Sequence, residues 1–260
     1  MKLTSRFWPL LVFTFVGYYT INAVKEQLQL IAINLAPVGK DSIGLDELFP
    51  YDSTKHTAAQ VYGSADQLRT WVADGDKSHY RYFFRYKRIG DSVKSGKWVE
   101  NVDGLPTAES LGVALKTGDA VFYYPFSKDQ TLSIPGEVVS QSSGILKQGL
   151  NMIGSGFPVS WNPNDEGTSY WGDTTKFTLA QAYGSADQIR VWVPGVKPDG
   201  DKYRYFFLYK RIGDSQKSNK WVENIEGLPV LEEPILTDRG FFYYRQKTGQ
   251  IVFEPPSLHL

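Results

Sequence analysis

The segment Tyr62–Arg69 reads YGSADQLR, and Tyr183–Arg190 reads YGSADQIR. Two further blocks recur at nearly the same offset, namely YRYFF (Tyr80–Phe84 and Tyr203–Phe207) and KWVEN (Lys97–Asn101 and Lys220–Asn224). An offset of about 120 residues is the length of a whole domain and is far longer than a solenoid repeat. The sequence therefore predicts a tandem duplication of one domain-sized unit.

Alternation of apolar and polar residues within the second copy predicts a β-strand. Between Asp187 and Val193, one face carries Ile189, Val191 and Val193, and the other carries Gln188, Arg190 and Trp192. Period-two alternation with β-branched residues is typical of a half-buried strand. Aromatic strands at Tyr203–Tyr209 and Gly240–Tyr244, separated by glycine-containing turns, continue the pattern. We predict an all-β protein of two tandem homologous domains, each an antiparallel β-sandwich or barrel-like fold.

The expected organisation has three parts: an apolar N-terminal segment (1–15), a first β-repeat (16–135) and a second β-repeat (136–260). Pro135-Gly136 is predicted to form a turn, and the serine-rich stretch 140–144 a loop. This junction is short, so the two repeats should lie close together. Helix is expected only in two short pieces, Leu45–Phe49 and Lys176–Gln181.

Composition limits the classes of function. The 260 residues contain 28 basic and 28 acidic side chains and no cysteine. A nucleic-acid-binding protein would show a basic footprint, so no nucleic-acid partner is expected. Without cysteine there are no disulfides, thiolate metal sites or cysteine nucleophiles. No cofactor is predicted.

The N-terminus combines Lys2 and Arg6 with an apolar run from Trp8 to Val16, which is typical of a signal peptide. The run is shorter than the ~20 apolar residues that a membrane-spanning helix needs. The repeat alignment instead predicts a β-strand from about Val16. Residues 1–15 then have three candidate roles: a membrane-targeting start, an extension of the first sheet, or a strand donated to another copy of the chain.

The aromatic residues beside arginine are the candidate binding residues. Arg69 and Trp71 share one strand face, as do Arg190 and Trp192, and tyrosines alternate with arginines in the next strand. Rigid aromatic rings beside arginine suit sugar stacking or a protein interface. The candidates are Trp71, Trp192, Arg69, Arg190, Tyr82, Tyr205, Trp98 and Trp221. The structural alternative is that both strand faces are buried, one in a domain core and one against the other domain.

Two other motifs suggest chemistry but favour plain turns. Ile89–Ser92 and Ile212–Ser215 read IGDS, like the nucleophile block of Gly-Asp-Ser hydrolases, which also needs an activating histidine. His56, His79 and His259 have no counterpart in the other repeat, so a turn is favoured and no catalytic residue is predicted. The loop Asn162–Asp173 and the Asp-Gly-Asp turns at 74–76 and 199–201 offer few carboxylates for calcium, so no metal site is predicted.

The order of these features resembles a group of duplicated, exported bacterial β-repeat proteins of uncharacterised function. The resemblance rests on VGYYTI at Val16–Ile21, the apolar segments Leu28–Ala32 and Leu150–Gly154, the SADQ strands, the KWV segments and GFFYY at Gly240–Tyr244. It implies export but no activity. Such proteins carry a signal peptide ahead of the first strand, whereas here the apolar run and the first strand are fused.

These observations predict a non-catalytic protein, exported to the periplasm, cell surface or medium, with a structural or interaction role. Self-assembly through residues 1–15 is one expected mode, and membrane contact is expected only through that segment. The alternative is a carbohydrate-binding module that uses exposed aromatic residues. A Gly-Asp-Ser hydrolase using Ser92 or Ser215 is the third hypothesis.

Overall fold

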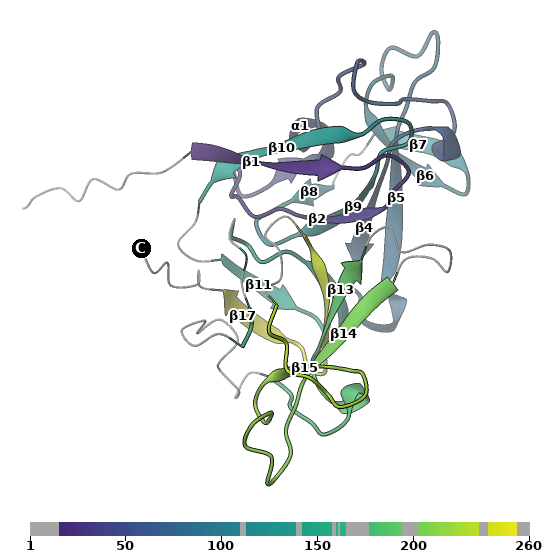
Figure 1. The fold of residues 1–260 in the computed structure, drawn as a ribbon. Helices are drawn as coiled ribbons and strands as arrows, with labels where there is room; N and C mark the ends of the chain where they lie inside the picture. Colours follow the sequence, from purple (N-terminus) through teal and green to yellow (C-terminus); the bar gives the residue numbers. More distant parts are fainter. Residues whose placement is uncertain are drawn as a thin grey trace, which may run out of the picture.

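The computed structural model describes residues 16–109, 113–138, 142–157, 160, 162–164, 177–193, 202–233 and 239–253. These residues form antiparallel β-sheets with one short α-helix, which confirms the predicted all-β class. None of the sheets formed by the described residues closes into a barrel. In Figure 1 the purple and blue strands lie in the upper part of the molecule, and the green and yellow strands lie in the lower part.

The largest sheet has six strands and comes from the first half of the chain. Its order is β2 (Gln29–Ala32), β9 (Ala120–Tyr124), β4 (Gln67–Val72), β5 (His79–Arg85), β6 (Trp98–Val102) and β7 (Leu105–Glu109). Two small ladders accompany it, β1 (Val16–Ala23) with β10 (Gln130–Glu137) and β3 (Ile43–Gly44) with β8 (Ala114–Leu115). The helix α1 spans Leu45–Leu48, and the 3-10 turns η1 and η2 span Tyr62–Ser64 and Gly75–Lys77.

The second half of the chain repeats this strand order. Its five-stranded sheet runs β12 (Gly149–Ile153), β16 (Phe241–Arg245), β13 (Gln188–Val193), β14 (Lys202–Leu208) and β15 (Trp221–Glu223). Its two-stranded ladder joins β11 (Ser142–Leu146) to β17 (Gly249–Phe253), and η3 spans Tyr183–Ser185. Registers also match, because Arg69 is opposite Tyr82 across β4 and β5, and Arg190 is opposite Tyr205 across β13 and β14.

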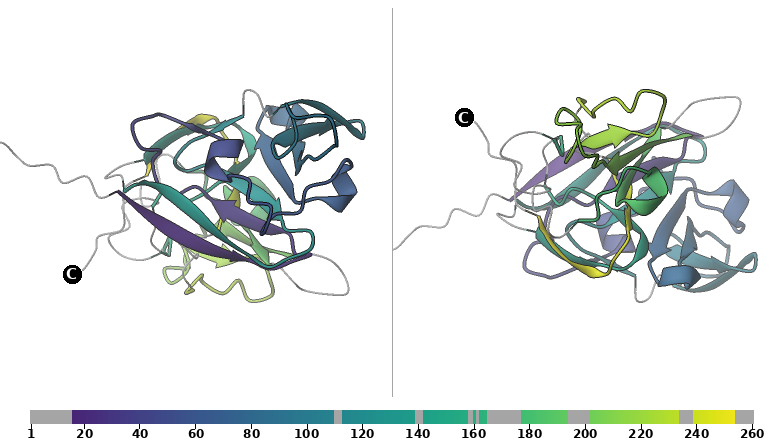
Figure 2. Two further views of the ribbon diagram at one scale, coloured as in Figure 1. Left: turned by 90° about the horizontal axis from the view of Figure 1, so that it is seen from above. Right: turned by 90° about the horizontal axis from the view of Figure 1, so that it is seen from below.

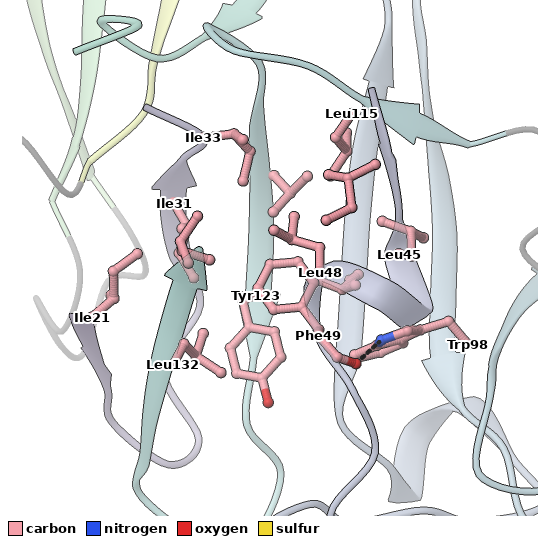
Figure 3. Packing of buried hydrophobic residues seen from close by; sticks show 14 of the residues in the cluster. Ile21, Ile31, Ile33, Leu45, Leu48, Phe49, Trp98, Leu115, Tyr123 and Leu132 are labelled. Carbon is pink, nitrogen blue, oxygen red and sulfur yellow. Dashed lines mark hydrogen bonds between the residues drawn. The ribbon is translucent and has the colours of Figure 1, made fainter. Parts of the chain in front are cut away.

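A two-layer core explains why these sequences form strands. In the first half, Leu68 and Phe83 of the six-stranded sheet pack in one cluster with Leu132 and Ile134 of β10, so the β1–β10 ladder covers one face of the sheet. Figure 3 shows this cluster, with Ile21 of β1 and Leu132 on one side and Trp98 on the other. Burial of one face by a second sheet is the arrangement of a β-sandwich.

The structure tests several local predictions. The strand expected from Val16 is confirmed as β1, and the helix expected at Leu45–Phe49 is confirmed as α1. Residues 1–15 lie outside the described part of the chain.

Two other local predictions are wrong. Pro135-Gly136 is not a turn, because both residues pair with β1 inside β10, and the described residues 142–144 of the expected loop belong to β11. No helix forms within Phe177–Gln181, where Ala180 instead makes a parallel bridge with Tyr209, as Ala59 does with Tyr86. The domain limits at 15/16 and 135/136 stay predictions, and β10 continues past the second of them to Glu137.

Candidate binding surface

Trp71 and Trp192 lie where the two halves of the chain meet. The indole Nε1 of Trp71 donates to the carbonyl of Leu150 over 2.7 Å, and the indole Nε1 of Trp192 donates to the carbonyl of Leu28 over 2.8 Å. Leu28 and Leu150 occupy matching positions in the sequence repeat. The two tryptophans therefore make the same contact in opposite directions across one interface. Figure 2 shows the purple and teal strands of the first half in front in the view from above, and the green and yellow strands of the second half in front in the view from below.

Matching residues of the repeat also touch one another at this interface. The rings of Phe122 and Phe242 have centroids 6.0 Å apart, and the side chains of Tyr80 and Tyr203 lie next to one another. A Cβ atom built on Gly240 would lie only 2.5 Å from the Cβ of Ala120, its counterpart. Burial here uses the strand face opposite the aliphatic face, and it covers the part of that face around Trp71 and Trp192.

The remaining tryptophan candidates lie in the cores. Trp98 is 0% exposed and Trp221 is 1% exposed, and Trp192 at the interface is 7% exposed. The indole Nε1 of Trp98 donates to the carbonyl of Phe49 (Figure 3). The expectation that these three residues are exposed aromatic platforms is wrong, because period-two alternation does not reveal which face a second layer covers.

The four other candidates form two matching sites, in which the tyrosines are exposed and the arginines are half-buried. Tyr82 and Tyr205 are 37% and 38% exposed, and the guanidinium carbons of Arg69 and Arg190 lie 5.7 and 5.8 Å from their ring centroids. Such distances fit a cation–π contact. The same contact between an arginine and a tyrosine is thus present in both halves.

Each site contains one further tyrosine that the sequence analysis did not single out. Tyr62 and Tyr183 pack edge-on against Tyr82 and Tyr205, with centroids 6.1 and 6.0 Å apart. Burial raises the pKa of both Tyr62 and Tyr183, and the neighbouring arginine partly offsets it. The sequence could have identified them, because each is the first residue of a repeated block, YGSADQ. We name the two sets the aromatic rims: Tyr62, Arg69 and Tyr82, and Tyr183, Arg190 and Tyr205.

The two aromatic rims are joined by a row of tyrosine rings through the interface. The ring centroids of Tyr80 and Tyr82 lie 6.1 Å apart, as do those of Tyr203 and Tyr205. The two sides meet through Phe122 and Phe242, which pack on Tyr80 and Tyr203 and on each other. In the first half, an open groove of about 480 Å³ runs past Tyr80, Tyr82, Glu100 and Asn101. The outward-facing part of this row is a polar aromatic surface, which suits recognition of sugars or protein side chains.

A buried carboxylate behind each rim anchors the loop that follows the neighbouring strand. Asp66 accepts hydrogen bonds from the Phe126 amide at 2.8 Å and the Gln130 side chain at 2.8 Å. Its counterpart Asp187 accepts from the Gln246 amide at 2.9 Å and forms an ion pair with Arg245 at 3.3 Å. The tyrosines Tyr123 and Tyr243 donate to these carboxylates. These contacts account for the repeated aspartate by folding alone.

These buried tyrosines predict a loss of stability in alkali. Burial, followed by the nearby aspartate charge, raises the pKa of Tyr123 and of Tyr243 above the ordinary value near 10. The two protonated tyrosines contribute to folding stability below about pH 10. This contribution is lost as pH rises further, because the tyrosine hydroxyls then release their protons only in the unfolded chain. The unfolding free energy should fall by about 1.4 kcal/mol per pH unit for each tyrosine. Urea titrations from pH 8 to pH 11 measure this slope.

Two phenylalanine variants provide the test of the alkaline effect. Tyr243→Phe and Tyr123→Phe should each make the decline above pH 10 shallower, whereas Tyr205→Phe, at a 38% exposed position, should leave it unchanged. Equal slopes in all four proteins would show that other groups control alkaline unfolding.

The Gly-Asp-Ser motifs form turns, as predicted. Ser92 and Ser215 are exposed in loops where Gly90 and Gly213 have φ +85°. His56 contacts Asp52, and His79 contacts the Lys77 carbonyl. Neither contact places a histidine against these serines.

The described residues include no group of three or more histidine, aspartate or glutamate side chains placed to hold a metal ion. Asn162 and Asn164 of the calcium-like loop bind backbone groups of the second half, including the Leu231 carbonyl. Asp74 begins the first Asp-Gly-Asp turn and pairs with Lys147. Residues 165–173 and 199–201 lie outside the described part of the chain.

Comparisons with known proteins give no relative. No protein-family model, no curated protein and no solved structure matches this chain. Among the described residues, no helix is long and apolar enough to span a membrane. The function proposed below therefore depends on the geometry of this chain alone.

Proposed function

We propose that the chain consists of two homologous β-sandwich domains related by a pseudo-two-fold axis. Support comes from the matching strand orders and from the reciprocal Trp71 and Trp192 hydrogen bonds. Self-matched contacts such as Phe122 with Phe242 lie on such an axis. Both faces of the central sheets are then occupied near the axis, and a binding surface has to lie further out, at the rims.

The function that the geometry supports best is a non-catalytic, exported interaction protein that binds its partner through the aromatic rims. The observation that carries this proposal is the same tyrosine–arginine arrangement at both ends of the tyrosine row, with cation–π distances of 5.7 and 5.8 Å. Exposed tyrosine and arginine are the residue types that dominate binding energy at interfaces. Export is proposed from the signal-like N-terminus, and self-assembly through residues 1–15 stays a separate hypothesis.

Photo-crosslinking tests this proposal. A photoreactive amino acid at Tyr82 or Tyr205 should give crosslinks to the same partner in an extract of the native cells and their medium. The same label at exposed Lys128, away from the rims, is the matched control. Products from both tyrosine positions that vanish with Arg69→Ala and Arg190→Ala support the rims as the binding surface. Identical products from Lys128 would contradict it.

A carbohydrate ligand is the second candidate, favoured by the open groove beside Tyr82. Tyrosine rings and hydroxyls suit sugar rings, although the tryptophans first expected in this role are buried. Glycan-array binding that disappears in the Tyr82→Ala, Tyr205→Ala double variant would identify the partner as a glycan. The hydrolase hypothesis predicts labelling of Ser92 or Ser215 by a fluorophosphonate probe, and we expect none.

A further inference from the structure

Two loops of identical sequence expose an isoleucine almost completely. Tyr86–Ser92 and Tyr209–Ser215 both read YKRIGDS. Ile89 is 97% exposed and Ile212 is 96% exposed, the highest values among the large apolar residues of the described chain. We name residues 87–97 and 210–220 the tip loops. A side chain that touches nothing in its own protein contributes nothing to the core.

The loop conformation explains some of the residues that the two tip loops share. Gly90 and Gly213 have φ +85°, a region that favours glycine. The Asp91 carboxylate accepts from the Lys94 amide, and Ser95 Oγ donates to the Arg88 carbonyl. The second loop repeats these bonds between Asp214 and Lys217 and between Ser218 and Arg211. These contacts explain the shared glycine, aspartate and serine, but they do not involve the isoleucine side chain.

The exposed isoleucine is the same in both loops, although another exposed position four residues away differs. Val93, which is 64% exposed in the same loop, is replaced by Gln216 in the second copy. Buried positions have changed as well, since Arg85 corresponds to Leu208. Surface loop positions without a role vary readily. An isoleucine kept at both exposed positions therefore indicates contact with something outside the chain.

Basic side chains flank each isoleucine. Lys87 and Arg88 precede Ile89, and Lys210 and Arg211 precede Ile212, all four exposed. In the part of the chain that the structure describes, none of these four side chains forms an ion pair. Each tip loop holds four basic residues and one acidic residue, although the whole chain is neutral. The surface that fits a tip loop is therefore anionic and offers an apolar layer.

The tip loops lie at opposite ends of the molecule. Tyr80 and Tyr203 meet at the interface, and from there β5 and β14 run outward at about 3.3 Å per residue. In Figure 1 the β5–β6 connection lies at the upper end and the β14–β15 connection at the lower end. One flat surface cannot contact both loops of one molecule.

We propose that the tip loops bind anionic lipid surfaces, with the isoleucine entering the interfacial layer and the neighbouring lysine and arginine contacting phosphates. Protein segments that bind at membrane interfaces typically combine an aliphatic side chain with basic side chains around it. A convex, protruding tip suits a fluid surface, which needs no matching pocket. Because the two tips point apart, one molecule connects two membranes. This inference uses residues other than the aromatic rims and is independent of their role.

Vesicle clustering tests the proposal. The full chain should sediment with vesicles of equal phosphatidylglycerol and phosphatidylcholine, should not sediment with phosphatidylcholine alone, and should raise light scattering by joining the anionic vesicles. Ile89→Ser or Ile212→Ser alone should abolish clustering but keep sedimentation. The double variant should lower the partition coefficient about tenfold or more, because each isoleucine loses its apolar transfer. Val93→Ser, at an exposed position that has diverged, is the matched control and should change neither measurement.

Three outcomes would overturn the proposal. The first is clustering that survives in the double variant, which would assign the effect to the N-terminal segment. The second is equal binding to neutral vesicles. The third is no vesicle binding together with crosslinking of a photoreactive residue at position 89 to an acidic protein, which would make the partner a protein. Circular dichroism of each variant checks the fold, and these surface substitutions should leave it intact.

Discussion

Gly240→Ala should destabilise the protein by about 2 kcal/mol, because the new methyl group overpacks the interface between the halves. Its Cβ would lie 2.5 Å from the Cβ of Ala120 and 3.0 Å from Cγ of Leu30. Gly240 and Ala120 are matching positions that face each other at the proposed pseudo-two-fold axis, where there is space for only one methyl group. Denaturant unfolding monitored by tryptophan fluorescence measures the loss as a lower midpoint at unchanged slope.

Exchanging the residues at positions 120 and 240 tests whether the two positions share one space. Ala120→Gly combined with Gly240→Ala moves the methyl group to the other side of the axis and should recover most of the lost stability. Gly63→Ala is the matched control, since no atom lies within 4 Å of its added Cβ. If the double variant is as unstable as the sum of the two single variants, the two positions do not share one space and the proposed axis is wrong.

Gly154 and Ala32 are a second pair of matching positions with space for only one methyl group. A Cβ on Gly154 would lie 2.7 Å from the Cβ of Ala32, again its counterpart. In a symmetric dimer of identical units, both positions would carry the same residue, so either two methyl groups would clash or two glycines would leave a gap. A single chain with two copies permits alanine on one side and glycine on the other. The proposed duplication would therefore allow tighter packing at the axis than two identical subunits achieve.

The strands were predictable because their alternation is a local property. Ile189 and Val191 pack in the core, and Arg190 and Trp192 lie on the opposite face, as the period-two pattern of β13 indicates. The helix expected at 176–181 failed for a non-local reason. Ala180 bridges to Tyr209, about thirty residues away in sequence, and this pairing overrides local propensity.

The candidate site was predictable only in part. The repeat identified Arg69 and Tyr82, but whether an aromatic strand face meets solvent or a second sheet depends on how the halves associate, which no local pattern encodes. Trp98 shows the limit most clearly, because KWVEN does not reveal which side of β6 the indole occupies. Ile89 shows the converse. Its identity with Ile212 was visible in the sequence, but its significance depends on an exposure that only the structure gives.

The two halves satisfy their buried aspartates differently, and this difference has a large expected effect. Asp187 is 1% exposed and faces Arg245, whose side chain is 4% exposed, at 3.3 Å. In the first half the position of Arg245 is occupied by Pro125, and Asp66 relies on Gln130 and backbone amides instead. The first half has a buried arginine elsewhere: Arg85 pairs with Asp46. Only the second half places the buried aspartate in direct ion-pair contact with an arginine among the described residues.

Asp187→Ala should destabilise the protein by about 3 to 5 kcal/mol, since it leaves the buried guanidinium of Arg245 without its carboxylate and removes the acceptor of the Tyr243 hydroxyl. Arg245→Leu should be similarly harmful, because it leaves Asp187 buried without a cation. The double variant Asp187→Ala, Arg245→Leu should be clearly more stable than the sum of its single variants predicts, because neither charge is then left buried without its partner. Urea unfolding of the four proteins gives the coupling free energy, which we expect to exceed about 1.5 kcal/mol.

Asp66 and Arg85 of the first half allow a control double-mutant cycle. Asp66 and Arg85 are both buried, but Arg85 forms its ion pair with Asp46, so the coupling between Asp66 and Arg85 should be distinctly smaller. Leucine is the residue that the second half carries in place of Arg85, at Leu208, which makes Arg85→Leu the natural substitution. Equal coupling in the two cycles would mean that long-range attraction, rather than direct contact, holds both carboxylates. A large coupling confined to Asp187 and Arg245 would instead show that two copies of one fold stabilise the same buried charge by different chemistry, since arginine contact serves one copy and amide hydrogen bonds serve the other.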